Sequence, residues 1–230
     1  MLPVLPAFYF GSVEHYLLLA RHAKVIIDVG EHYERQSYRT RTSIVGPNGI
    51  QHLNVRITRD HGHKMPMRTV GLTYAENWPQ QHLHAMRSAY GQTPWFIHYF
   101  DDIEATLLHG YSHLVELDLA TMRLGMKWLG LRTEVIVRET YVEPHDEIPV
   151  PMGPMNMEHS SLAGNHHEIL DLRHAFHPKK ALPVGIPILP SYQQAFADRH
   201  GFIGRMSVID LMCNLGPMAA THLAQGQGAG

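Results

Sequence analysis

The chain has 230 residues, a formal net charge of −2 and 44% hydrophobic residues, which is enough for one sizeable core. The small net charge excludes the broad basic surface of a typical nucleic-acid-binding protein. No apolar run approaches the roughly 20 residues of a membrane helix, and charged residues interrupt the first 30 residues where a signal peptide would be apolar. We therefore expect a cytoplasmic globular protein without a membrane span.

The first third of the chain is rich in strand patterns. The elements expected there are a helix over 12–22 and strands over 24–29, 37–45, 50–57 and 67–74. Ser12 is the predicted N-cap of the helix. Gly46-Pro47-Asn48-Gly49 separates two of the strands, and its Asn-Gly pair favours a hairpin because both residues tolerate positive φ angles.

Helical spacing dominates the later part of the chain. The expected elements are helices over 78–90, from Pro94 onward, and over 112–129, 191–202 and 207–217, with a strand over 133–139. Gly91 is the predicted stop of the first of these helices, and Thr93 is the predicted cap of the next. The aromatic residues after Pro94 are interpreted as core between these two helices.

These patterns predict a single α+β domain over residues 1–222, with N-terminal strands and a hairpin followed by a helix-rich C-terminal part. Residues 140–165 contain four prolines and no periodicity, so they predict a long irregular loop that serves either as a lid or as a flexible crossing. Residues 223–230 are expected to form a flexible tail.

Arg39 and Arg41 are the first candidates for binding an anion. In an extended segment, residues two apart point to the same face, so "YRTR" would present two guanidinium groups together. Two adjacent like charges repel unless an anion lies between them. That anion could be a substrate phosphate or carboxylate, or Glu31 or Glu34 of the same chain, and a solvated strand face is the alternative without function.

The segment "HAFHPKK", residues 174–180, is the second candidate. His174 and His177 could share a helix face, which Pro178 would end, so that Lys179 and Lys180 would lie at a helix C-terminus where cations are favoured. In a functional interpretation, His177 is a general base and Lys179 binds an anion beside it. A purely structural capping role for the lysines remains the alternative.

Histidine is unusually frequent, with 19 residues, so metal binding must be considered. His82 and His84 would diverge on a helix, whereas His61 and His63 lie in a turn-like segment. The cluster at 165–168 lacks the spacing of a helical zinc site. We expect no metal site and no cofactor, although a site assembled from distant histidines stays open as an alternative.

Several of these segments occur in an order that resembles the WbqC-like family over about residues 3–217. They are "VIIDVGEHYERQSYRTRTSI", "AYGQTPWF", "HPKK" and "SVIDLMCNLGP". The family pattern falls on Glu31, Tyr33, Gln36, Tyr38, Arg39, Arg41, Tyr90, Pro94, Phe96, His177, Pro178 and Lys179. The chain departs from many members at Leu5, which stands where they have glutamine.

The resemblance implies a bacterial protein of surface-polysaccharide or O-antigen assembly that transfers an acyl or aminoacyl group, such as glycine, to an amino sugar. Its partners would be a nucleotide- or lipid-linked amino sugar and an activated acyl donor. The expected catalytic residues are His177 as base and Tyr38 and Gln36 as oxyanion donors. The expected substrate-binding residues are Arg39, Arg41, Lys179, Glu31, Tyr33 and His82.

Two other functions stay open at this point. A non-catalytic protein of the same pathway would use the arginines to bind a sugar nucleotide or to act as a scaffold. A metal-dependent hydrolase would use the histidine clusters.

Overall fold

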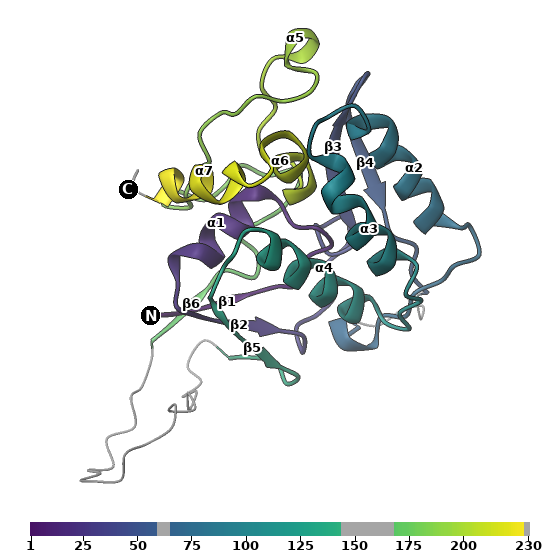
Figure 1. Cartoon of the computed structure of the whole chain (residues 1–230). Coiled ribbons are helices and arrows are strands. Elements are labelled where there is room, and N and C mark those ends of the chain that lie inside the picture. Colours follow the sequence, from purple (N-terminus) through teal and green to yellow (C-terminus); the bar gives the residue numbers. More distant parts are fainter. Residues whose placement is uncertain (59–64, 144–167, 228–230) are drawn as a thin grey trace, which may run out of the picture.

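The main sheet of the protein is parallel. The computed structural model describes residues 1–58, 65–143 and 168–227, and its four-stranded sheet has the order β5-β2-β1-β6. The strands are β1 (Leu2–Leu5), β2 (Lys24–Asp28), β5 (Glu134–Arg138) and β6 (Ile169–Asp171). Every neighbouring pair runs parallel, so all four carboxyl ends lie at one edge (Figure 1).

β1, β2 and the helix α1 (Val13–Arg21) form a βαβ unit. The two inner strands are almost completely buried, which is why their sequences are continuous apolar runs and not alternating ones. The expected helix and strand are confirmed here, and Ser12 is the N-cap residue, although its side chain makes no capping hydrogen bond. The parallel pairing itself was not predicted.

The expected hairpin is confirmed as β3 (Arg41–Gly46) and β4 (Gly49–Asn54), which pair antiparallel with Gly46 opposite Gly49. Of the Asn-Gly pair, only Gly49 has a positive φ, at 98°. The prediction of a strand over 67–74 is wrong. That segment contains the short 3-10 helix η1 (Met67–Thr69) and isolated bridges from Gly71 and Leu72.

Three helices follow: α2 (Trp78–Tyr90), α3 (Phe96–Leu107) and α4 (Leu114–Trp128). Thr93 does not cap α3, since its hydroxyl donates to the carbonyl of Tyr90 at 2.8 Å and the helix begins two residues beyond Pro94. His113 caps α4 in a reciprocal capping box with Glu116. Of the aromatic residues assigned to the core, Phe96 and Phe100 are buried.

The C-terminal part contains α5 (Ala197–His200), α6 (Val208–Leu215) and α7 (Met218–Gln227). The expected helix over 191–202 is wrong, because only the single turn α5 is helical there. The expected tail over 223–230 begins inside α7, where Leu223 is buried. Of its residues, 228–230 lie outside the described chain. Most of the expected 140–165 loop also lies outside it.

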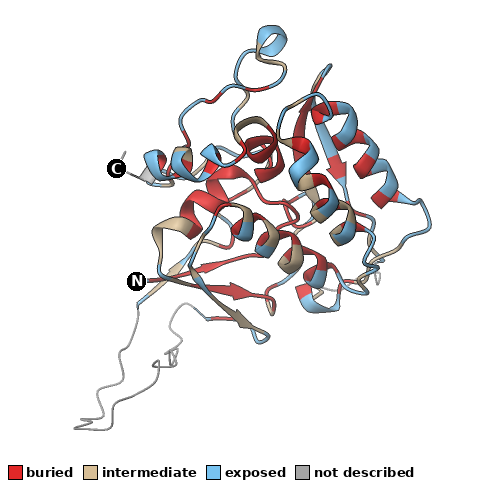
Figure 2. Cartoon of the chain, viewed as in Figure 1, coloured by how far each residue is buried: buried red, intermediate tan, exposed pale blue. Residues whose placement is uncertain are grey.

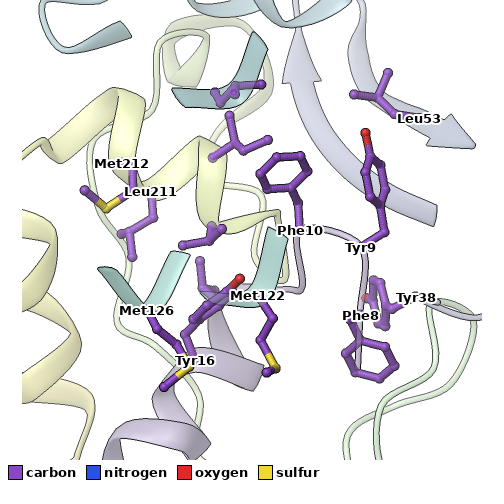
Figure 3. Packing of buried hydrophobic residues seen from close by; sticks show 14 of the residues in the cluster. Phe8, Tyr9, Phe10, Tyr16, Tyr38, Leu53, Met122, Met126, Leu211 and Met212 are labelled. Atoms are coloured by element: carbon purple, nitrogen blue, oxygen red, sulfur yellow. The ribbon is translucent and has the colours of Figure 1, made fainter. Parts of the chain in front are cut away.

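The α+β class is confirmed, and one buried cluster contains side chains from β1 through α7 (Figure 2). Its centre is the segment that follows β1, where Phe8, Tyr9 and Phe10 are all fully buried. Figure 3 shows Phe8 beside Tyr38 and these rings surrounded by side chains of several helices. In Figure 1, α1, α6 and α7 gather on one side of this core, and α2, α3 and α4 lie with the hairpin on the other.

Candidate functional site at the carboxyl edge of the sheet

Charged residues follow the strands at the carboxyl edge of the parallel sheet. Asp28 ends β2 and Asp171 ends β6, while Glu31 and Arg173 come shortly afterwards. β1 lies between these strands, with β2 on one side and β6 on the other. In open parallel sheets, ligands bind beyond the carboxyl ends, at the point where successive connections leave in opposite directions. The charged cluster occupies that position.

Arg173 joins two strand ends. Its guanidinium donates from Nε and Nη2 to Asp171, at 3.0 and 2.6 Å, and from Nη1 to Asp28 at 2.6 Å. Asp28 also accepts the backbone N–H groups of Gly30 and Val142. Hydrogen bonds and the positive charge of Arg173 outweigh the effect of burial and lower the pKa of Asp171. This arrangement fixes the edge of the sheet.

Arg39 forms the second buried centre. Its Nε and Nη2 donate to the two carboxylate oxygens of Glu31 at 2.8 and 2.6 Å, and Nη1 donates to Glu34 at 3.2 Å. Nη2 also donates to the carbonyl of Arg173, at 3.3 Å, which links the two arginine centres. Burial raises the pKa of Glu31, and the charge of Arg39 opposes that rise. Arg39 is therefore occupied by the chain's own carboxylates.

The loop between β1 and α1 contains a residue with a strained backbone conformation. Phe10 has a φ of 41°, which is rare for an aromatic residue. Its backbone N–H donates to the hydroxyl of Thr121 at 3.1 Å, and its carbonyl accepts the hydroxyls of Thr42 and Ser207. Strain of this kind persists only where the surroundings over-determine it, as these hydrogen bonds do. The loop thereby positions the buried side chain of Glu14 in the first turn of α1.

Lys179 contacts both Gln36 and His177 at the surface of this edge. Lys179 Nζ donates to Gln36 Oε1 at 2.6 Å, although 143 positions separate the two residues. The backbone N–H of Lys179 donates to His177 Nδ1 at 3.1 Å. Gln36 is exposed and has a φ of 56°, which directs the chain through a tight turn. These three residues form what we call the edge cluster.

Arg205 supports the edge cluster from below. Its Nη1 donates to the carbonyl of Lys180 at 2.7 Å and its Nη2 to the carbonyl of His177 at 2.8 Å. The same side chain influences Tyr38: burial raises the pKa of the phenol, and the charge of Arg205 opposes the rise. Tyr38 is nearly inaccessible, with 4% of its surface exposed. Tyr38 therefore interacts with Arg205 from a buried position and does not reach the surface at which Gln36 and Lys179 lie.

Burial and the charges of Lys180, Lys179 and Arg205 lower the pKa of His177, against the opposing charge of Glu34, and so favour the neutral ring. Its Nδ1 accepts a backbone hydrogen bond, so the neutral ring carries its proton on Nε2. The side chain therefore presents a donor to its surroundings. The helix predicted over 174–177 does not form: residues 173–175 and 178–179 are turns, and the residues between them have no regular structure.

Other residues assigned to the site lie elsewhere or serve the fold. Arg41 does not face Arg39; its Nε donates to Asn54 of β4 at 3.0 Å. Tyr33 lies near the hydroxyl of Thr40, at 3.5 Å. His82 is buried on α2, where its Nδ1 lies 2.9 Å from the hydroxyl of Tyr9 and its pKa is lowered to about 4, mainly by burial.

Sequence reasoning missed Asp28, Asp171, Arg173 and Asp118. The first three had a usable signal, since each charged residue directly follows or ends a short apolar run. Asp118 had none, because it lies within a regular helix. Its carboxyl is fully buried without a hydrogen-bond partner among the described residues, and burial raises its pKa well above the usual value.

Metal-site geometry is not seen in the part of the chain that the structure describes: no three histidine, cysteine or acidic side chains come together there. His61, His63 and the cluster at 165–168 lie outside it. Among the described helices, none combines the length and apolar character of a membrane-spanning segment.

The fold and the edge cluster define an α+β protein with a polar centre at the carboxyl end of a parallel sheet. The WbqC-like protein family model matches residues 9–222, and the chain belongs to that family. Searches of curated proteins and of solved structures gave no match.

Proposed function

We propose that this protein is an acyl- or aminoacyltransferase that acts on an amino sugar in surface-polysaccharide assembly. The observation that carries the proposal is the contact of Lys179 with Gln36, at 2.6 Å. It brings together two distant segments of the family pattern, beside His177 and at the sheet edge where α/β proteins bind ligands. Membership of the WbqC-like family supports the pathway assignment.

Lys179, the cation of the edge cluster, is suited to bind an anionic substrate group. Within the described residues, Lys179 pairs with a neutral amide and not with a carboxylate, and Arg41 likewise pairs with Asn54. Arg39 and Arg173 are already neutralised by acidic side chains. We therefore assign phosphate or carboxylate binding to Lys179 and assign Arg39 to the framework.

In the proposed reaction, the amine nitrogen of the sugar forms a bond to the acyl carbonyl carbon. The bond from that carbon to the donor's sulfur or oxygen then breaks, and the donor leaves as a thiol or an alcohol. One amine proton must be removed, and a proton must reach the leaving sulfur or oxygen, so the base passes on the proton that it takes up. The tetrahedral oxyanion needs hydrogen-bond donors. His177 Nε2–H and the amide of Gln36 are suited to donate to the oxyanion.

His177 is less suited to be the base, because its Nδ1 is held by the backbone of Lys179 and its Nε2 carries the proton. Glu34 is the better acceptor for the amine proton. Arg39 Nη1 and His174 Nδ1 both lie beside Oε2 of its carboxylate, at 3.2 and 3.6 Å, and the side chain is 29% exposed. Its charge opposes the lowering of the pKa of His177. This assignment replaces the expected base role of His177.

The proposal is tested by incubating the purified protein with UDP- and dTDP-linked amino sugars and three donor types: acyl thioesters, aminoacyl thioesters and aminoacyl-tRNA. Mass spectrometry detects an acylated sugar. We expect Lys179→Ala to raise the KM for the sugar nucleotide about tenfold or more, consistent with loss of a charge-assisted contact. Lys127→Ala is the matched control, since Lys127 is an exposed lysine that pairs with Asp102 on the far helices.

Formation of no acylated sugar with any donor, together with stoichiometric binding of a sugar nucleotide, would overturn the transferase. It would establish the second candidate, a binding protein without catalysis. The occupied Nδ1 of His177 is the observation that favours this second candidate. Native mass spectrometry of the same samples reports the bound sugar nucleotide directly.

A further inference from the structure

A cavity of about 600 Å³ lies between the α2–α3 junction and the segment before α5, and its described lining residues do not include those of the edge cluster. Its volume falls within the range of small-molecule sites, about 300–1,000 Å³. The residues that line it come from four separate parts of the chain. They are Pro47, Ser88, Ala89, Gln92, Thr93, Pro94, Gln193, Gln194, Ala195, Phe196 and Asn214. In Figure 1, α2 and the turn between β3 and β4 lie on one side of this region, and α6 and the segment before α5 lie on the other.

Among the residues that the structure describes, no ionisable side chain lines this cavity. Its polar lining consists of two hydroxyls and four carboxamides, in contrast to the charged carboxyl edge of the sheet. A phosphate or carboxylate would find no side-chain cation there, and an ammonium group would find no carboxylate. The lining therefore favours an uncharged ligand.

Several of the lining polar groups are free to bind such a ligand. Among the described residues, the side chains of Ser88 and Gln92 form no hydrogen bond within the chain. Asn214 uses its Nδ2 to donate to the carbonyl of Asp210 at 2.7 Å, which leaves its Oδ1 available. Gln193 makes one long contact, at 3.5 Å. Carboxamides offer donors and acceptors together, which matches hydroxyl groups that also do both.

The floor of the cavity is rigidly held. Asp210 is fully buried and accepts from the hydroxyls of Tyr90 and Tyr192, at 2.7 and 2.6 Å, and from Gln194 Nε2 at 2.8 Å. Gln194 also exchanges two hydrogen bonds with the backbone of Ile203. Because this network fixes Gln194 and the neighbouring loop, the cavity is preformed, and little conformational entropy is lost when a ligand enters.

Flat apolar surfaces complete the lining. Phe196 is half-buried, and Pro47 and Pro94 are exposed around it. The guanidinium of Arg199 lies 5.9 Å from the Phe196 ring but does not line the cavity. A pyranose ring has hydroxyls around its rim and C–H groups on its faces, so it can satisfy the carboxamides while it packs against such surfaces. We propose that this cavity is a binding site for an uncharged glycan unit, separate from the edge cluster.

This inference does not depend on the proposed transferase, because it follows from the lining alone. It is tested by titrating the full isotopically labelled chain with the methyl glycosides of glucose, galactose, mannose, N-acetylglucosamine and N-acetylgalactosamine. Amide chemical shifts locate the binding. We expect shifts at Ser88, Gln92 and Asn214 for at least one glycoside, with none near Gln36 and Lys179.

Two variant pairs provide controls. Ala195→Trp fills the cavity from an exposed position, and Ala105→Trp places the same side chain on exposed α3 outside it. Gln92→Ala removes a free amide, and Gln51→Ala removes one from the exposed face of β4. We expect the first member of each pair to weaken binding about tenfold or more and the second to leave it unchanged.

The proposal is overturned if no glycoside shifts the cavity residues at tens of millimolar, or if Ala195→Trp and Ala105→Trp bind equally. It is also overturned if a proline-rich peptide shifts these residues and the glycosides do not. Failure of the acylation assay with glycoside binding intact would reject the transferase alone. Acylation that persists in Ala195→Trp, with no glycoside binding in the natural chain, would reject the cavity site alone.

Discussion

The guanidinium of Arg39 donates two hydrogen bonds to the carboxylate of Glu31, at 2.8 and 2.6 Å, and both side chains are almost completely buried. A bidentate pair of this kind is strong and geometrically specific. It lies where the sequence suggested an exposed anion-binding arginine. The sequence left open whether Arg39 binds a substrate anion or an acidic residue of the same chain. In the structure its partners are Glu31 and Glu34.

Removing Arg39 should therefore damage the fold first. Arg39→Met leaves Glu31 buried without a countercharge, which costs about 3–5 kcal/mol of unfolding free energy. Arg41→Met is the control, because Arg41 bonds an exposed asparagine and its loss should cost less than about 1 kcal/mol. Urea denaturation of both variants measures the difference. The double variant Glu31→Leu/Arg39→Met should recover part of the loss, and equal stability of the two single variants would contradict the assignment.

His177 offers a test that separates a donor from a base. Glutamine keeps an N–H donor near the position of Nε2 but cannot take up a proton. If His177 stabilises the oxyanion, His177→Gln should retain much more turnover than His177→Ala, which should lose about 100-fold or more. Steady-state kinetics of both variants in the acylation assay give the comparison. Equal loss in the two variants would restore His177 as the base.

The buried His15 predicts a loss of stability in acid. Its ring is surrounded by Phe8, Tyr16 and Phe176, and burial lowers its pKa from 6.5 to about 3. Below pH 6.5 the unfolded chain binds a proton that the folded chain does not, so this contribution to stability is present above pH 6.5 and is lost as the pH falls toward 3. Buried acids with raised pKa values, such as Asp118 and Glu14, act in the opposite direction.

A variant isolates the histidine from these acids. Relative to the natural chain, His15→Leu should remove up to about 1.4 kcal/mol of pH dependence per pH unit between pH 6 and pH 4. Denaturation midpoints over this range provide the measurement. His84→Leu, at an exposed position of α2, should leave the slope unaltered. An unchanged slope in His15→Leu would show that His15 is protonated in the folded protein.

Gly30 allows the close approach of two backbones beside the Asp28–Arg173 ion pair. A Cβ added at Gly30 would meet backbone atoms of Glu139, Thr140 and Tyr141, which cannot move aside as a flexible side chain would. Gly30→Ala should therefore destabilise the protein by about 1–3 kcal/mol. Gly204→Ala is the control, since Phe202, at 3.7 Å, is the only described residue that an added Cβ there would meet. Thermal unfolding of the two variants should separate them, and similar midpoints would refute the close approach.

The sequence was sufficient for elements whose signals are local. The apolar run of β2, the hairpin turn before Gly49 and the Ser207 start of α6 all form as expected, because periodicity, turn chemistry and capping act within a few residues. Expectations failed where a local pattern had no packing partner. Residues 191–202 have helical spacing, yet only α5 forms, since Tyr192 and Gln194 bond to Asp210 instead of completing a helix.

The candidate site shows the same division. The sequence singled out Gln36, His177 and Lys179 as members of one site, and the tertiary structure places Gln36 beside Lys179. The sequence could not show that Arg39 would pair with Glu31 and Glu34, because the choice between an internal and an external anion depends on burial. The cavity beside Gln92 could not be predicted from the sequence either, since its lining residues come from segments that are distant along the chain.

By itself, the sequence determined the α+β class, most element positions and the family to which the chain belongs. The tertiary structure decided the parallel strand order and the pairing of the two buried arginines with acidic side chains. It also decided the cavity lined by uncharged residues. Local elements follow from short-range steric and hydrogen-bonding preferences of the backbone. Strand order, charge neutralisation and cavities depend on which distant segments meet, and that is settled by the balance of burial and desolvation over the whole fold.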